Sequence, residues 1–116
     1  MLNLAVAGVE GGETACKLAR KWGYKVKKIP QNQAKIVFVE GNFWGRTLAA
    51  ISSSTDPDSF GGYGPFMPGF TIIPYDDVAA LEVRLRTSTF CLFLTLHENL
   101  EVRLSTSTFC LFFNIA

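Results

Sequence analysis

The feature that most constrains the fold is an amphipathic helix preceded directly by glycines. Between Ala15 and Trp22 the apolar residues recur at i, i+3, i+4 and i+7, which places them on one helical face. The acidic residues lie in the first turn and the basic residues toward the other end, as the helix dipole favours. The pattern predicts a helix over residues 10–22, with Gly23 as the glycine that ends it.

A short run of β-branched and aromatic residues, 35–39, predicts a buried strand that ends before Gly41. Further elements are expected in this order: a short helix over 46–51, a long loop over 52–69, a strand over 71–75 and a helix capped by Asp76 or Asp77. Pro74 predicts that the second strand lies at a sheet edge or ends early. The alternation of helices and strands indicates an α/β fold.

The composition excludes several classes of function. With 116 residues, 48% of them hydrophobic, the chain can form one domain with a real core. A net charge of +1 provides no overall field that would steer it to nucleic acid or to a membrane, so neither is expected as a partner. The three cysteines and single histidine form no CxxC or HxxxH pattern, so no metal site is expected and the thiols should be reduced.

Charge is nevertheless segregated along the chain. Residues 10–35 carry seven basic and two acidic side chains, whereas residues 36–82 carry one basic and six acidic. All six lysines lie between Lys17 and Lys35.

The C-terminal part contains a duplication. Residues 81–94 recur as residues 100–113, with 12 of 14 positions identical. Two copies are too few for a solenoid, and their TSTFCLF segments have high β propensity. We therefore expect poorly packed strands or unstructured chain over 87–96 and 106–113, and divide the chain into units 1–82 and 83–116.

Two segments carry residues suited to binding. Residues 8–12 (GVEGG) would place backbone N–H groups and the positive dipole end at a helix start, where an anion can bind. An ordinary glycine-rich turn is the alternative. Residues 41–47 (GNFWGRT) follow a strand and offer aromatic faces for stacking and the guanidinium of Arg46 for a carboxylate. The alternative is that both aromatics lie in the core and Arg46 pairs with a surface acid.

Together these segments resemble a known family. Residues 8–24, 41–47, 52–57 and 64–70 are similar, in order and in spacing, to the ornithine aminotransferases. These belong to the class-III pyridoxal-phosphate aminotransferases of fold type I. The resemblance extends over residues 8–82 and implies part of the large, cofactor-binding domain, followed by a tail unlike the family.

The resemblance implies roles for four residues. Gly8 and Val9 would bind the phosphate of pyridoxal 5'-phosphate through backbone N–H groups, Phe43 would stack on its pyridine ring, and Arg46 would hold the substrate α-carboxylate. The implied reaction transfers the δ-amino group of ornithine to a 2-oxo acid such as 2-oxoglutarate. It also implies a homo-oligomer in the mitochondrial matrix or the cytosol, although no targeting segment is visible.

The chain departs from the family in ways that affect function. Val6 and Ala7 stand where the family has polar residues before the phosphate-binding turn, and no lysine follows Lys35. The Schiff-base lysine and the acid at the ring nitrogen therefore have no counterpart, so no catalytic residue is assigned and the chain alone is expected to be inactive.

Three functions stay open. The first is an ornithine aminotransferase fragment, and the second is a non-catalytic product that associates with full-length subunits. The third is a small anion-binding module built on residues 8–12 and 17–28.

Overall fold

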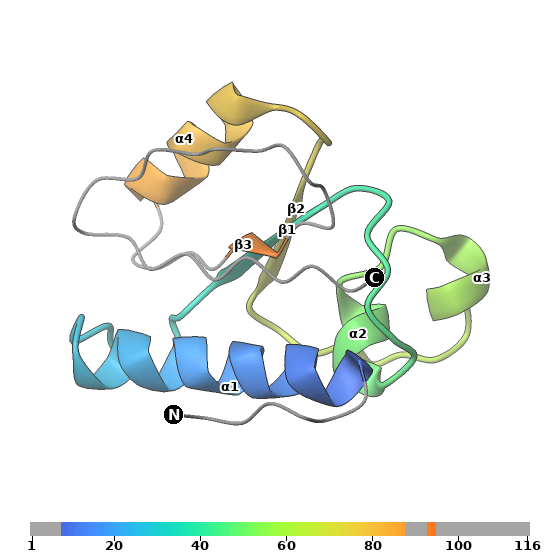
Figure 1. Ribbon diagram of the computed structural model, residues 1–116, viewed down its shortest axis with the longest axis horizontal. Helices are drawn as coiled ribbons and strands as arrows, with labels where there is room; N and C mark the ends of the chain where they lie inside the picture. The colour runs from blue at the N-terminus through green and yellow to red at the C-terminus, as the bar shows by residue number, and fades with distance from the viewer. Residues whose placement is uncertain (1–7, 88–92, 95–116) are drawn as a thin grey trace.

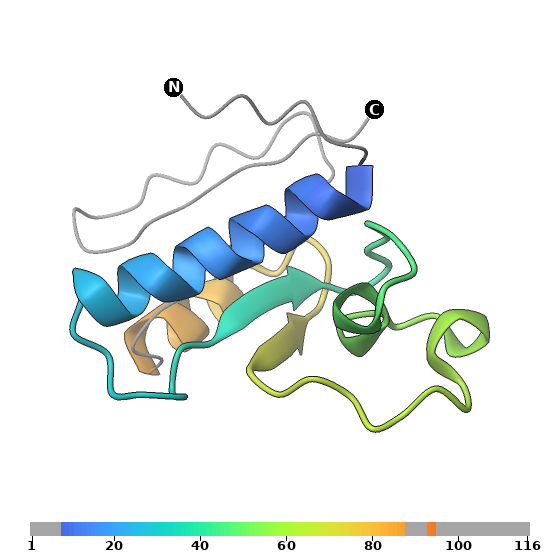
Figure 2. The same cartoon turned by 90° about the horizontal axis from the view of Figure 1, so that it is seen from below.

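A computed structural model describes residues 8–87 and 93–94. This part of the chain forms a parallel β-sheet with helices on both faces (Figures 1 and 2), which confirms the expected α/β class. The elements, in chain order, are α1 (Gly8–Lys25), β1 (Ile36–Val39), α2 (Leu48–Ser52), α3 (Pro57–Phe60), β2 (Phe70–Ile73), α4 (Val78–Thr87) and β3 (Phe93–Leu94).

The central strand is β1, which pairs in parallel with β2 on one side and β3 on the other. Ile36 lies opposite Phe70, and Val37 lies opposite Phe93. All four β1 residues are buried because α1 covers one face of the sheet and α4 lies over the other (Figures 1 and 2). A strand covered on both faces has no solvent side, which accounts for its continuous apolar sequence.

The main core lies between α1 and the sheet. Phe38 stacks on Trp44 at 5.5 Å between ring centroids and meets the edge of Phe70 at 5.3 Å. From α1, Cys16 and Ala19 complete this core. The predicted helical face is thus confirmed in part: Ala15 and Ala19 are buried, but Leu18 is 41% exposed, and Cys16 takes its place.

Helix α1 is longer than the prediction, and Gly23 does not end it. Gly23 is buried within the helix, and its carbonyl accepts a hydrogen bond from the Ile29 amide at 3.1 Å. The left-handed residue that turns the chain is instead Lys28, with φ of 60°. The prediction was wrong because the helix continues through Gly23 to Lys25, and the chain turns only after it.

The other boundaries follow the expected order. The long loop contains α3, which begins with Pro57 after the N-cap Asp56. Strand β2 ends at Ile73, just before Pro74, as predicted, and among the described strands it lies at the edge of the sheet. Asp77, not Asp76, caps α4: its Oδ1 accepts the Ala80 amide at 2.8 Å.

The duplicated segment begins within α4, so this helix crosses the boundary expected after residue 82. Residues 93–94 form β3, whereas the second TSTFCLF segment, within 106–113, lies outside the described residues. No helix in the described part of the chain is long and apolar enough to cross a membrane.

Candidate functional site

The glycine-rich segment forms the beginning of α1. Gly8 is exposed and Val9 is half-buried, and amides in a first helical turn have no acceptor within the helix. Gly12 has a different role, because a Cβ built there would lie 2.5 Å from Cε3 of Trp44. The exposed first turn is thus suited to an anion, whereas Gly12 allows the indole ring to contact the helix backbone.

The loop after β1 directs alternate side chains inward and outward. The Asn42 amide donates hydrogen bonds to the carbonyls of Val39 and Ser53, at 2.7 and 2.8 Å. Trp44 is only 4% exposed, and its Nε1 donates to Ser53 Oγ at 2.8 Å. Phe43, between them, is 55% exposed. Of the two aromatics, Trp44 therefore belongs to the core, and Phe43 offers a face to a ligand.

Arg46 lies beside Phe43 on the exposed side of this loop. Its Cζ is 5.7 Å from the Phe43 ring centroid, within cation–π range. Within residues 8–87 and 93–94, no carboxylate forms an ion pair with Arg46. The guanidinium can therefore bind a carboxylate while it remains next to an aromatic ring.

Gly45 brings the loop against the first turn of α1. Its φ is +145°, and a Cβ built there would overlap the side chain of Val9. Val9 contacts Gly45, and Gly12 contacts Trp44. The two motifs are therefore in direct contact, although Gly12 and Gly45 are 33 residues apart in the sequence. The structure brings the helix start and the Phe43–Arg46 segment together in one place.

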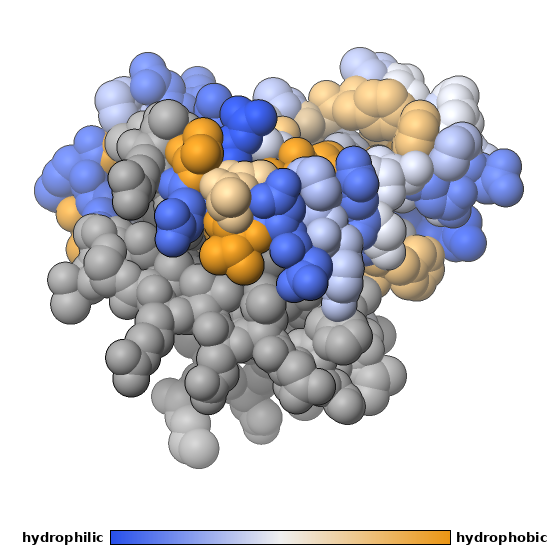
Figure 3. Space-filling view, turned by 90° about the horizontal axis from the view of Figure 1, so that it is seen from above, coloured by the Kyte–Doolittle hydropathy of each residue, from blue (hydrophilic) through white to orange (hydrophobic). Residues whose placement is uncertain are grey.

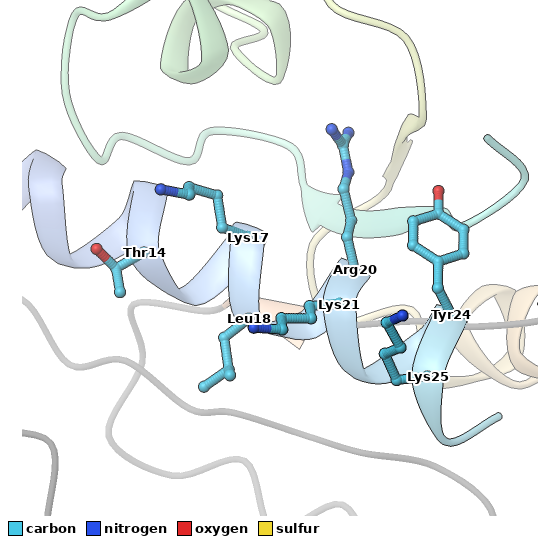
Figure 4. A pocket seen from close by; sticks show the side chains of 7 residues that line it. All are labelled: Thr14, Lys17, Leu18, Arg20, Lys21, Tyr24 and Lys25. Atoms are coloured by element: carbon cyan, nitrogen blue, oxygen red, sulfur yellow. The ribbon is translucent and has the colours of Figure 1, made fainter. Parts of the chain in front are cut away.

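The lysines lie elsewhere. Lys17, Lys21 and Lys25 follow one side of α1, and the other three lie in or after the link that leaves it. Lys17, the nearest in sequence, is nine residues beyond Gly8, about 13 Å along the helix axis. Lys17, Lys21 and Lys25 border a hollow of about 550 Å³ along α1, and none of the four residues assigned above is among its described lining residues (Figure 4). These are Thr14, Lys17, Leu18, Arg20, Lys21, Tyr24 and Lys25.

The described residues contain no cluster of His, Cys, Asp or Glu suited to a metal ion. Cys16 is a buried thiol in the core. Burial raises the pKa of Cys16 to about 12, although the charge of Arg20 opposes this shift. A thiol that stays neutral and inaccessible is a structural residue.

The class-III aminotransferase model matches residues 1–106. The chain belongs to the class-III aminotransferase family. Over 87 residues it is 67% identical to the mitochondrial ornithine aminotransferase of Drosophila melanogaster and 64% identical to that of Rattus norvegicus. Each alignment covers 75% of this chain and 20% of the relative, so the chain spans about a fifth of the length of these class-III aminotransferases.

Solved structures agree with this family. The ornithine aminotransferase of Toxoplasma gondii matches with a TM-score of 0.71 and 48% identity, over 75% of this chain and 21% of that one. The acetylornithine aminotransferase of Elizabethkingia anophelis matches with a TM-score of 0.50 and 49% identity, over the same shares. The described part of this class-III aminotransferase chain thus has the fold of one portion of a fold-type-I enzyme, which confirms the expected fold and family.

Sequence reasoning overlooked the residues that hold the site in place. Asn42, Ser53 and Gly12 make the contacts that turn Trp44 inward and leave Phe43 outside. Gly12 and Asn42 lie within the two binding segments of the sequence, but this placement does not identify their partners on another element.

Proposed function

We propose that this chain supplies part of the cofactor and substrate site of an ornithine aminotransferase. In this proposal the amides of Gly8 and Val9 bind the phosphate of pyridoxal 5'-phosphate, Phe43 stacks on the pyridine ring, and Arg46 binds the substrate α-carboxylate. The observation that carries it is the contact between Gly45 and Val9, because it unites the two motifs in one site.

The residues present fit the phosphate end of this cofactor. The exposed start of an 18-residue helix combines N–H groups that have no acceptor within the helix with the positive end of the dipole. Gly8 has no side chain to keep a phosphate oxygen away from the backbone. Such a site holds the phosphate through backbone groups, so it depends on helix position more than on side-chain identity.

Phe43 and Arg46 fit the ring and the substrate. The Arg46 guanidinium lies over the Phe43 ring, and the 55% exposure of Phe43 leaves surface for a flat heterocycle. A guanidinium is planar and matches a carboxylate with two parallel hydrogen bonds. These residues therefore bind and orient a ligand that has a ring at one end and a carboxylate at the other.

When bound, pyridoxal phosphate supplies an electron sink for amino-group transfer. The described lysines lie on α1 and the following link, outside the loop that carries Phe43 and Arg46, and we assign none of them to the covalent attachment of this cofactor. We therefore assign binding and orientation to the chain and no proton transfer. Ornithine and 2-oxoglutarate are the proposed substrates of the complete site, and the Toxoplasma relative, whose structure is described with partial occupancy of PLP at its active site, supports the cofactor.

The proposal is tested by titrating the 116-residue chain with two phosphorylated ligands. Pyridoxamine 5'-phosphate carries the phosphate and ring without an aldehyde that could react with lysines. N-(5'-phosphopyridoxyl)-ornithine, linked through the δ-nitrogen, adds the α-carboxylate. We expect the wild-type chain to bind the second ligand about tenfold more tightly, since a charge-assisted hydrogen-bonded pair contributes about 1.5–3 kcal/mol.

Arg46→Ala should abolish this preference and leave pyridoxamine phosphate affinity unchanged. Phe43→Leu should weaken both ligands, because it removes the stacking surface. Lys21→Ala is the matched control, as it removes an exposed positive charge outside the loop. An unchanged preference in Arg46→Ala, or an equal loss in Lys21→Ala, would refute the assigned role of Arg46.

A second proposal is association with full-length aminotransferase subunits. Among the described strands, β2 has a neighbour on one side only. Apolar side chains also reach the surface at the end that carries α3 (Figure 3), where Phe66 and Met67 are 48% and 38% exposed. Size-exclusion chromatography of labelled chain mixed with a full-length ornithine aminotransferase tests this, and elution of the label at its free position would contradict it.

We also propose a mitochondrial location. The relatives from Drosophila and rat are named as mitochondrial enzymes. Fractionation of cells that produce the endogenous protein, followed by antibody detection, tests this proposal, and detection only outside the mitochondrial fraction would refute it.

A further inference from the structure

A side-chain hydrogen bond joins α1 to the residue that follows Arg46. The hydroxyl of Thr47 donates to Oε1 of Glu13 at 2.5 Å, across 34 positions of sequence. Oγ1 of Thr47 also accepts a hydrogen bond from the Ala50 amide at 3.2 Å, so Thr47 is the N-cap of α2. One hydroxyl therefore connects three elements: α1, the loop after β1 and α2.

Glu13 lies on the side of α1 that faces this loop. Val9, Gly12 and Glu13 have the i, i+3, i+4 spacing of one helical face, and their contacts are with Gly45, Trp44 and Thr47 in turn. The first two contacts are apolar and set the distance between helix and loop. Only the third is directional, because a hydroxyl and a carboxylate oxygen must align for a hydrogen bond.

Within the described residues, no lysine or arginine forms an ion pair with Glu13, and its contact is the Thr47 hydroxyl. Glu13 is half-buried, and among the described residues the Thr47 hydroxyl is its hydrogen-bond donor. Its place, one turn after Gly8 and Val9 and opposite the residue next to Arg46, suits an alignment role.

We infer that Glu13 is a positioning residue that holds Phe43 and Arg46 at a fixed place relative to the first turn of α1, through its hydrogen bond to Thr47. This inference rests on the proposed function only for the identity of the ligand; the positioning of the loop by Glu13 does not depend on it. A ligand held at one end by the helix start and at the other by Arg46 requires both elements in register. A ligand held by phosphate and ring, without a carboxylate, depends on Glu13 far less.

The test compares Glu13→Ala, Glu13→Gln and the control Glu82→Ala in the full 116-residue chain. Glutamine keeps an oxygen that accepts the Thr47 hydroxyl, and Glu82 is an exposed acid on α4. Two properties are measured. The first is hydrogen exchange, without ligand, of the backbone amides of Ala50 and Ile51, which donate to the hydroxyl oxygen and to the carbonyl of Thr47. The second is the dissociation constants of pyridoxamine phosphate and N-(5'-phosphopyridoxyl)-ornithine.

In Glu13→Ala we expect exchange at the Ala50 and Ile51 amides to rise about tenfold and affinity for the ornithine adduct to fall about tenfold, because one hydrogen bond to a charged group is lost. Pyridoxamine phosphate affinity should change less than about twofold, because this ligand has no α-carboxylate and does not depend on the position of Arg46. Glu13→Gln should restore both properties, and Glu82→Ala should match wild type. If Glu13→Ala fails to fold, Thr47→Val and Thr47→Ser replace it, because only serine retains the hydroxyl.

Exchange in Glu13→Ala equal to that in Glu82→Ala would overturn the inference. An equal loss of affinity for both ligands would also overturn it, as it would indicate a general loosening rather than misalignment. If the wild-type chain binds neither ligand, the proposed function fails, whereas the exchange comparison still decides whether Glu13 orders the loop.

Discussion

Gly12 shows how closely a single residue can be determined by a neighbour far away in sequence. Its backbone lies against the Trp44 ring, and a Cβ at this position would lie only 2.5 Å from Cε3 of that ring. Gly12→Ala should lower the free energy of unfolding by about 1–3 kcal/mol, since overpacking outweighs the gain of about 1 kcal/mol in helix propensity. Urea denaturation followed by circular dichroism measures this change.

A double-mutant cycle identifies the cause. In a Trp44→Phe background the smaller ring should relieve the contact and reduce the cost of Gly12→Ala. Lys21→Ala, at an exposed position of the same helix, should change stability by less than about 0.5 kcal/mol. An undiminished cost in the Trp44→Phe background would mean that the indole ring is not what excludes a side chain.

Cys16 predicts a dependence of stability on alkaline pH. Burial raises the pKa of its thiol from 9.0 to about 12, so the folded chain retains a proton that the unfolded chain loses. The neutral, buried thiol therefore contributes to the free energy of unfolding in full below pH 9. This contribution is lost as pH rises toward 12, at about 1.4 kcal/mol per pH unit. Glu13 adds to this shift and Arg20 opposes it.

The comparison requires two chains that differ only at this position. In a background with Cys91→Ser and Cys110→Ser, the wild-type Cys16 chain and its Cys16→Ala variant are unfolded with urea at pH 8 and pH 10.5. The Cys16 chain should lose about 2 kcal/mol more than the variant between these pH values. Parallel losses in the two chains would contradict a buried, neutral thiol.

At the scale of elements, α4 depends on a side chain outside the helix. Asp77 Oδ1 accepts the Ala80 amide, which would otherwise have no partner in the first turn. Asp77→Ala should therefore reduce stability by about 1 kcal/mol, whereas Asp77→Asn keeps an acceptor and should cost little. Thermal denaturation of the two variants distinguishes capping from charge: equal midpoints for Asn and Ala would contradict the capping role.

The ends of α1 show why element boundaries are harder to predict than elements. Its periodicity indicated a helix, and a helix is present. The end depended on where the chain could turn back toward the sheet, and Lys28, at φ 60°, takes that position while Gly23 is buried. Local signals rank possible ends, but packing against the strand selects one.

At the scale of the whole molecule, we expect the 116-residue chain to bind the proposed ligands without catalysing amino-group transfer. Phe43 and Arg46 can orient a ring and a carboxylate, but the described lysines lie on α1 and its link, and no lysine follows Lys35 in the sequence. Amino transfer on this cofactor requires a lysine amine that holds it and moves the substrate proton. The 116-residue chain should therefore produce glutamate 5-semialdehyde from ornithine and 2-oxoglutarate no faster than free pyridoxal phosphate does.

The assay is run with the wild-type chain, with Arg46→Ala and with cofactor alone. Surface lysines can react with the aldehyde without giving turnover, so product formation is the quantity to measure, not absorbance of the bound cofactor. Turnover well above free cofactor that disappears in Arg46→Ala would show that the required groups have been misjudged.

Local sequence patterns predicted the main helices and strands in their order, except α3, which lies within the expected loop, and they indicated the two segments that we propose as a binding site. The helices and strands follow from periodicity and glycine placement, whereas the family follows from the resemblance of several segments, GNFWGRT among them. The sequence by itself did not separate Phe43 from Trp44, or assign Gly12 and Glu13 to partners. The tertiary structure decided these, because exposure and hydrogen bonding depend on which surfaces meet when α1 packs against β1 and its loop.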